Sequence, residues 1–243
     1  MRILVSNDDG VFSPGILALA KVAQEFGQTR VVAPDVEQSA MSHAITVRRP
    51  LHYTKTVLED GIEAYRVDGT PADCVALGTH HWDEVDLVLT GINLGHNLGH
   101  NIWHSGTVAA AKQAAFLRIP AIAFSARYSD TVTDYSKLAP FIRDVITDML
   151  ETPQTLLLNV NFPDDPVGVM WTRQSVRQYE GYVIPGEDPM GRAHYWFAEE
   201  PRERIEEGTD RWAVEHDHVS VTPLRLDLTD ETVLAHAKAV SSR

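Results

Sequence analysis

The sequence contains almost no cysteine: Cys74 is the single one among 243 residues. One cysteine excludes a disulfide within the chain and fits a reducing compartment, so we expect Cys74 to act as a small buried hydrophobic residue. No apolar run approaches the roughly 20 residues that a membrane-spanning helix needs. Polar residues interrupt the first apolar run, so no secretory signal is expected there. These absences predict a cytoplasmic protein without a membrane partner.

Positive charge is also scarce. Lysine and arginine total 21 against 34 aspartates and glutamates, which gives a net charge of −13. This balance argues against broad binding to nucleic acid or anionic membranes, because both need a basic patch. It leaves room for a small phosphorylated substrate, because one local cation can dominate a site. With 44% hydrophobic residues, the chain is able to bury one large core.

The most informative segment is the first ten residues. The apolar run from Ile3 to Val5 predicts a buried strand that ends at a polar turn containing Asp8, Asp9 and Gly10. In open α/β sheets, ligands bind at the carboxyl ends of the strands. Two adjacent carboxylates repel unless a cation lies between them, and their oxygens suit Mg²⁺ or Mn²⁺. The alternative is a polar turn whose aspartates cap the next helix, and this segment alone does not decide.

An alternation of strands and helices follows, which is typical of a parallel sheet with crossover helices. We expect strands over residues 3–5, 30–33, 44–53, 63–67, 85–90, 121–125 and 156–160, the last being the final strand of the core. We expect helices over residues 14–26, 71–77, 107–117 and 135–150. The pattern predicts an α/β fold.

The character of the sequence changes after Pro163, where the alternation ends. We expect strands over residues 169–182, 193–198 and 212–222, followed by a polar tail. A strand pair of this kind protrudes unless something covers it, so we expect a contact between subunits there. This divides the chain into a core over residues 1–163 and an extension over residues 164–243.

A glycine-rich loop over residues 91–107 is the second candidate for a ligand site. Its glycines recur every four residues, which is not the dinucleotide-binding spacing. At its end, Ser105, Gly106 and Thr107 open a helix, and a hydroxyl with free amides at a helix N-terminus can hold a phosphate. An ordinary serine cap is the alternative. His96, His100 and His104 recur every four residues, but the glycines argue against a continuous helix and hence against a zinc site.

Several motifs, in this order along nearly the whole chain, resemble the SurE family, the stationary-phase-survival 5′-nucleotidases. They are Ser6-Asn-Asp-Asp-Gly10, Val32-Ala-Pro-Asp35, Gly69-Thr-Pro-Ala-Asp-Cys74, Gly91-Ile-Asn93, Asn97-Leu-Gly99, Ser105-Gly-Thr-Val-Ala-Ala-Ala111, Asn159-Val-Asn-Phe-Pro163, Gly208-Thr-Asp-Arg-Trp212 and Val219-Ser-Val-Thr-Pro-Leu224. The sequence departs from the pattern after Ser39, where many members have glycine, and at Asp217-His218, where a glycine–aromatic pair is usual.

The resemblance implies a Rossmann-like three-layer core with a parallel sheet and a β-rich C-terminal extension for oligomerisation, as a homodimer or a dimer of dimers. It implies hydrolysis of nucleoside 5′-monophosphates to nucleoside and phosphate, with one divalent cation, Mg²⁺ or Mn²⁺, per subunit. The implied metal ligands are Asp8, Asp9, Ser39 and Asn93, of which the two aspartates are also catalytic. The implied phosphate-binding residues are Asn97, Ser105, Gly106 and Thr107.

Other functions compete with this interpretation. A covalent aspartyl phosphatase needs an Asp-x-Asp pattern after the first strand, and a receiver domain needs a phosphate-accepting aspartate at a later strand end. This chain has Asp8-Asp9 and Gly91-Ile92-Asn93 at those places. A non-catalytic, metal-dependent nucleotide-binding protein is the remaining alternative. The sequence leaves open which aspartate, if either, is the general base.

Overall fold

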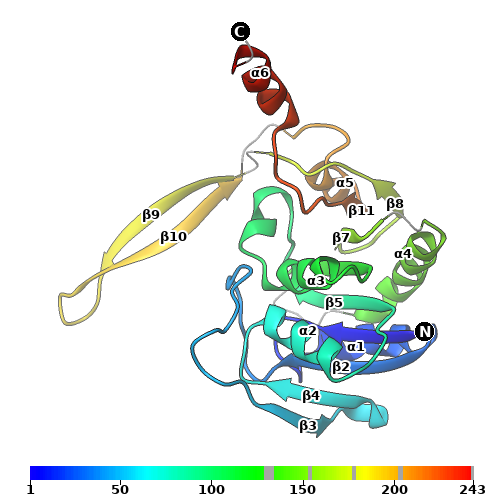
Figure 1. Cartoon of the computed structure of the whole chain (residues 1–243). Coiled ribbons are helices and arrows are strands. Elements are labelled where there is room, and N and C mark those ends of the chain that lie inside the picture. The colour runs from blue at the N-terminus through cyan, green and yellow to red at the C-terminus, as the bar shows by residue number, and fades with distance from the viewer. Residues whose placement is uncertain (129–133, 153–154, 177–178, 202–204, 242–243) are drawn as a thin grey trace.

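A mostly parallel sheet runs through the centre of the chain (Figure 1). The computed structural model describes residues 1–128, 134–152, 155–176, 179–201 and 205–241. Within these ranges the sheet has nine strands in the order β3-β4-β2-β1-β5-β6-β7-β11-β8. The strands are β1 (Arg2–Ser6), β2 (Gln28–Pro34), β3 (Tyr53–Val57), β4 (Glu63–Val67), β5 (Leu87–Leu94), β6 (Ala121–Ala126), β7 (Leu157–Phe162), β8 (Gly168–Trp171) and β11 (His218–Pro223).

Helices cover both faces of the sheet. In the described ranges the helices are α1 (Pro14–Ala23), α2 (Pro71–His80), α3 (Gly106–Phe116), α4 (Ala139–Glu151), α5 (Asp210–Glu215) and α6 (Glu231–Ser241), with 3-10 turns η1 (Glu59–Gly61), η2 (Gly99–Trp103) and η3 (Tyr135–Leu138). Helix α6 buries no residue and projects away from the sheet (Figure 1). Helices α1 and α4 share one apolar cluster, and α2 and α3 share the other. Along β1, Ile3 and Val5 enter the first cluster and Leu4 the second. Because neighbouring side chains on a strand alternate between faces, a wholly apolar strand serves both layers. The predicted three-layer α/β core is confirmed.

The helix starts follow the chemistry that the sequence indicated. The Ser13 side chain accepts from the Ile16 N–H ahead of α1, with Pro14 in the first turn. Ahead of α2, Thr70 and Asp73 form a reciprocal capping box. None of the helices in the described ranges is long and apolar enough to cross a bilayer.

The predicted strand over residues 44–53 is wrong, since β3 begins only at Tyr53. In the segment before it, side chains rather than a neighbouring strand satisfy backbone donors. The Thr46 N–H donates to Asp73 at 3.0 Å and the His52 N–H donates to Asp68 at 2.8 Å. Pro50 contributes no N–H at all. A ladder of backbone hydrogen bonds therefore starts after this segment.

The predicted strand over residues 212–222 is also wrong in its first half. Thr209 caps a short helix, α5, by accepting from the Trp212 N–H, and β11 begins at His218. Strand β11 pairs antiparallel with β7 and parallel with β8, so β7 is not the last strand of the core as predicted. The end of the chain forms helix α6, where a polar tail was expected.

Two strands after β8 leave the sheet and form a separate hairpin. The predicted strand over residues 169–182 divides into β8 and the start of β9 (Tyr179–Glu187), with residues 177–178 outside the described ranges. Strand β9 pairs antiparallel with β10 (Ala193–Pro201). Figure 1 shows this hairpin projecting away from the sheet, as expected for a protruding pair.

Candidate active site

The carboxyl ends of β1 and β5 lie side by side, because the two strands are parallel neighbours with Ser6 opposite Thr90. Asp8 and Asp9 follow β1, and Asn93 is near the end of β5. The Leu94 N–H points to the Asp9 carboxylate, with 3.4 Å between the nitrogen and Oδ2. The structure thus brings the two aspartates to the strand end that carries Asn93.

The turn after β1 is held by Asn7. Its side-chain oxygen accepts from the Gly10 N–H at 3.2 Å, and its amide nitrogen donates to the Gly10 carbonyl at 3.0 Å and to the Ser13 hydroxyl at 2.7 Å. Gly10 has a φ of +100°, a conformation that glycine adopts without strain. The buried Asn7 side chain therefore fixes the turn that presents both carboxylates.

The N-terminus of α3 packs directly on Asp8. The Thr107 hydroxyl donates to Asp8 Oδ1, and Asp8 is only 4% exposed. A Cβ added at Gly106 would lie 2.8 Å from Asp8 Oδ2, so glycine is required there. The Ser105 side chain accepts from the Val108 N–H at 3.0 Å and caps the helix. The helix N-terminus predicted to bind phosphate, Ser105 to Thr107, therefore lies next to Asp8.

In the absence of a cation, burial disfavours the ionised form of both carboxylates. Burial raises the pKa of Asp8, although the hydrogen bond from Thr107 lowers it. The pKa of Asp9 is raised to about 7, first by burial and then by the charge of Asp8. Within the described residues, neither aspartate forms an ion pair with a lysine, arginine or histidine. Like charges in this setting favour a cation bound between them.

The other two predicted metal ligands offer neutral oxygens beside this pair. The Asn93 amide nitrogen donates to the Gly95 carbonyl at 2.7 Å, so its amide oxygen is the end left for a cation. The Gln38 N–H donates to the Asp8 carbonyl at 2.7 Å, which brings the loop carrying Ser39 to the aspartates. The Ser39 hydroxyl itself is exposed and donates to Glu37 at 2.7 Å. An all-oxygen set of this kind fits Mg²⁺ or Mn²⁺.

The histidines of the glycine-rich loop do not form a zinc site in the described part of the chain, where no group of three His, Cys, Asp or Glu could hold a metal. A ring nitrogen of His96 lies 2.8 Å from the Phe162 carbonyl, and burial lowers the pKa of the ring. His100 lies in the short η2 turn, and no continuous helix carries the three rings. The loop is therefore not organised around these imidazoles.

Comparison with known proteins identifies the family. The family model for "Survival protein SurE" matches residues 3–181. The chain belongs to the SurE family. A curated member from Thermus thermophilus, named 5′-nucleotidase SurE 1, is 53% identical over 94% of this chain and 93% of its own length. Another, 5′-nucleotidase SurE from Deinococcus radiodurans, is 46% identical over 94% of this chain and 88% of its own. The crystal structure of the SurE protein from Aquifex aeolicus superimposes with a TM-score of 0.85 at 41% identity, covering 99% of this chain and 100% of that one.

In this SurE chain, Asn97 is held from both sides and points into the sheet. Its side-chain nitrogen donates to the Ser125 hydroxyl at 2.8 Å. Its N–H donates to Asn161 at 2.8 Å, and its carbonyl accepts from Asn159 at 2.8 Å. The sequence analysis assigned no supporting role to Asn159 and Asn161, the two asparagines of β7. Their signal was visible, since two polar residues interrupt the apolar strand Leu-Leu-Asn-Val-Asn-Phe.

Gly99 is held in the same way by residues from the end of the chain. Its N–H donates to Asp210 at 2.8 Å, and its carbonyl accepts from Gln174 at 2.8 Å. Asp210 is fully buried and also accepts from the N–H groups of Ser175 and Arg211. Sequence reasoning gave no role to these side chains. Residues in the C-terminal third of this SurE chain therefore hold the glycine-rich loop in place.

Proposed function

We propose that this chain hydrolyses nucleoside 5′-monophosphates to nucleoside and phosphate, with one Mg²⁺ or Mn²⁺ bound in each subunit. The observation that carries the proposal is the pair of buried Asp8 and partly buried Asp9 beside the N-terminus of α3, with Asn93 on the neighbouring strand. The names of the SurE relatives support the same reaction. The partner we propose is a small nucleotide in the cytoplasm, without nucleic acid or membrane.

In this proposal, Asp8, Asp9, Ser39 and Asn93 hold the cation. The bound ion would polarise the phosphoryl group and lower the pKa of an attacking water. Asp8 is kept in place by Thr107 and by the close packing of Gly106. In the part of the chain that the structure describes, Asp9 has one long contact, from the Leu94 N–H at 3.4 Å, so it is the carboxylate with more freedom to accept a proton.

The phosphate lies, in the same proposal, at the start of α3. The first N–H groups of a helix have no partner within the helix, and its dipole favours an anion there. Ser105, Gly106 and Thr107 supply this end, where Ser105 is 6% exposed. Asn97 is the fourth residue that we propose to bind the phosphate, and β7 holds its backbone in place. Preorganised donors of this kind stabilise charge as it develops on the phosphoryl oxygens.

We also propose that the chain works as a homo-oligomer, a homodimer or a dimer of dimers, joined through the extension over residues 164–243. Both faces of β10 present large apolar side chains to solvent. Tyr195, Trp196 and Phe197 are 66%, 66% and 91% exposed. A neighbouring subunit would bury them, since a patch of this kind marks an interface.

The test is phosphate release from a panel of nucleoside 5′-monophosphates, using metal-stripped protein with and without Mg²⁺ or Mn²⁺. We expect release only with metal, and a large loss in Asp8→Asn at limiting metal. Asp144→Asn, an exposed change on α4, is the matched control. Folded protein that binds nucleotide by calorimetry but releases no phosphate would establish instead the alternative, a non-catalytic metal-dependent nucleotide-binding protein.

A further inference from the structure

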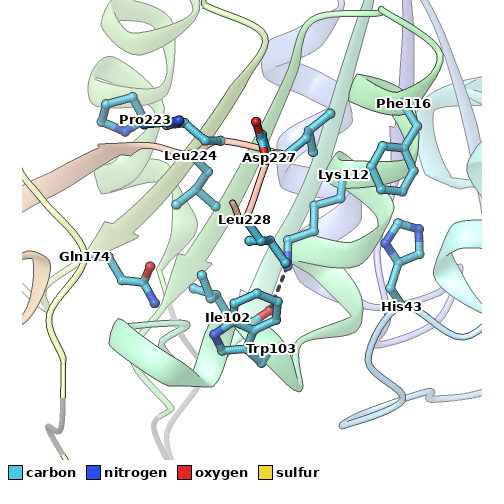
Figure 2. Close-up of a pocket in the computed structure, with 12 residues that line it drawn as sticks. His43, Ile102, Trp103, Lys112, Phe116, Gln174, Pro223, Leu224, Asp227 and Leu228 are labelled. Carbon is cyan, nitrogen blue, oxygen red and sulfur yellow. Dashed lines mark hydrogen bonds between the residues drawn. The ribbon is translucent and has the colours of Figure 1, made fainter. Parts of the chain in front are cut away.

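A cavity of about 380 Å³ lies beside α3, and neither Asp8 nor Asp9 lines it (Figure 2). Its walls come from four segments far apart in the sequence. They include His43, Trp103, Lys112, Phe116, Leu224 and Leu228. The volume is at the lower end of the range for small-molecule pockets. Its mixture of flat rings, leucines and two cations, Lys112 and Arg225, suits a planar ligand with polar edges.

Aromatic rings form one side of this cavity. The His43 ring stacks on Phe116 with 5.1 Å between ring centroids, and its ring nitrogen lies 3.0 Å from the Gln113 side-chain oxygen. Trp103 lies beside the end of the Lys112 side chain in Figure 2, and 47% of its surface is exposed. The His43–Phe116 wall is fixed by its own contacts, whereas Trp103 keeps open ring surface for a partner.

Lys112 contacts the tryptophan and is one of two basic side chains that line the cavity, the other being Arg225. Its ammonium lies 4.9 Å from the Trp103 ring centroid and 3.4 Å from the Ile102 carbonyl oxygen. Burial lowers its pKa. Asp227 also lines the cavity, but within the described residues Lys112 forms no ion pair with it. An ammonium with so few acceptors favours a ligand that offers a ring nitrogen or a carbonyl oxygen.

Two segments of the chain link this cavity to the proposed phosphate-binding site at the N-terminus of α3. Trp103 lies two residues before Ser105, a separation of at most about 7.6 Å between Cα atoms. In the other segment, His43 follows the loop that carries Ser39. The Ser42 N–H donates to the His104 carbonyl at 3.0 Å and joins the two segments. A ligand with its phosphate at α3 can therefore extend its other end toward Trp103.

We propose that this cavity receives the base of the nucleotide substrate, and that the base is a purine stacked on Trp103. Lys112 would donate to purine N7, and to O6 where the base carries one, since lysine pairs well with these acceptors. A bicyclic base also covers more of the tryptophan ring than a pyrimidine does. The proposal rests on the proposed function, because it names the part of the substrate that this second region binds.

The test compares Trp103→Ala with the wild type on purine nucleotides, pyrimidine nucleotides and 4-nitrophenyl phosphate. The ring of the last substrate is joined directly to the phosphate and cannot reach the cavity. We expect kcat/KM for purine nucleotides to fall about 5- to 100-fold, mainly through KM, as for other bases stacked on aromatic side chains. Activity on 4-nitrophenyl phosphate should stay within about twofold, and Trp103→Phe should recover most of the loss.

The control is Trp171→Ala on β8, where the side chain is 49% exposed, close to the value for Trp103. An equal loss on all three substrates, an unchanged KM for purines, or a change in oligomeric mass in Trp103→Ala would overturn the proposal. If the wild type hydrolyses nothing, the proposed function fails, but the pocket is still tested. Calorimetry with a purine nucleoside monophosphate should then show weaker binding to Trp103→Ala, and equal binding would reject the pocket.

Discussion

Replacing Asp9 with asparagine should make the metal-free protein more stable at alkaline pH while removing its activity. The side chain is partly buried next to Asp8, and the structure holds its pKa at about 7. The variant keeps the shape and keeps an oxygen that accepts from the Leu94 N–H. The substitution removes a negative charge that burial and the neighbouring charge of Asp8 both disfavour. In the folded wild type, that charge is destabilising, and a bound cation would offset it.

Proton linkage gives the sign and the size of this difference in stability. An unfolded aspartate loses its proton near its usual value of 3.8, whereas folded Asp9 keeps its proton up to about 7. Between these values the folded state binds more protons, so the stability of the wild type falls as pH rises. The ceiling for this loss is about 4 kcal/mol at 1.36 kcal/mol per pKa unit. Because part of the side chain contacts water, we expect about half, or ~2 kcal/mol.

The assay is urea unfolding of EDTA-treated wild type, Asp9→Asn and the control Asp144→Asn at about pH 5 and about pH 8. The free energy of unfolding of Asp9→Asn should exceed that of the wild type, and the excess should be larger at the higher pH. Added Mg²⁺ or Mn²⁺ should stabilise the wild type more than the variant, because it binds only the folded state. An excess that is the same at both pH values, or a wild type that is more stable without metal at the higher pH, would refute the reasoning.

Three further predictions concern the surroundings of the site. Gly106→Ala should reduce kcat/KM at least tenfold and stability by about 1–3 kcal/mol, because the new methyl group overlaps Asp8; Gly181→Ala, in open space, is the control for the same assays. Asp210→Asn should destabilise the fold by about 2 kcal/mol in urea unfolding and lower kcat, because its amide would face an N–H donor of the glycine-rich loop. Phe197→Asp should lower the oligomeric mass in light scattering, and an unchanged mass would exclude this side chain from the subunit contact.

Much of the fold was predictable because its signals are local. Apolar runs such as Ile3 to Val5 and capping residues such as Thr70 act within a few positions, and the structure confirms both. The error over residues 44–53 came from partners that lie far away in sequence. Asp68 and Asp73 take the hydrogen bonds that a strand would have used, and no local pattern reveals this.

The site was predictable to a similar degree. Asp8, Asp9 and the start of α3 were identified from their place at strand and helix ends, and the structure brings them together. Asp210 was not identified. Its role depends on a hydrogen bond to Gly99, 111 residues earlier, and long-range contacts of this kind leave no periodic trace.

The support of the glycine-rich loop by Asn159, Asn161 and Asp210 has a consequence during synthesis. Both aspartates and the start of α3 leave the ribosome well before Asp210 does, since domains emerge N-terminal end first. Until Asp210 reaches Gly99, the loop lacks its buried acceptor. An incomplete chain can therefore contain every proposed metal ligand while its glycine-rich loop is still not held in place. Such a chain becomes able to catalyse only after α5, which contains Asp210, has been synthesised and has folded.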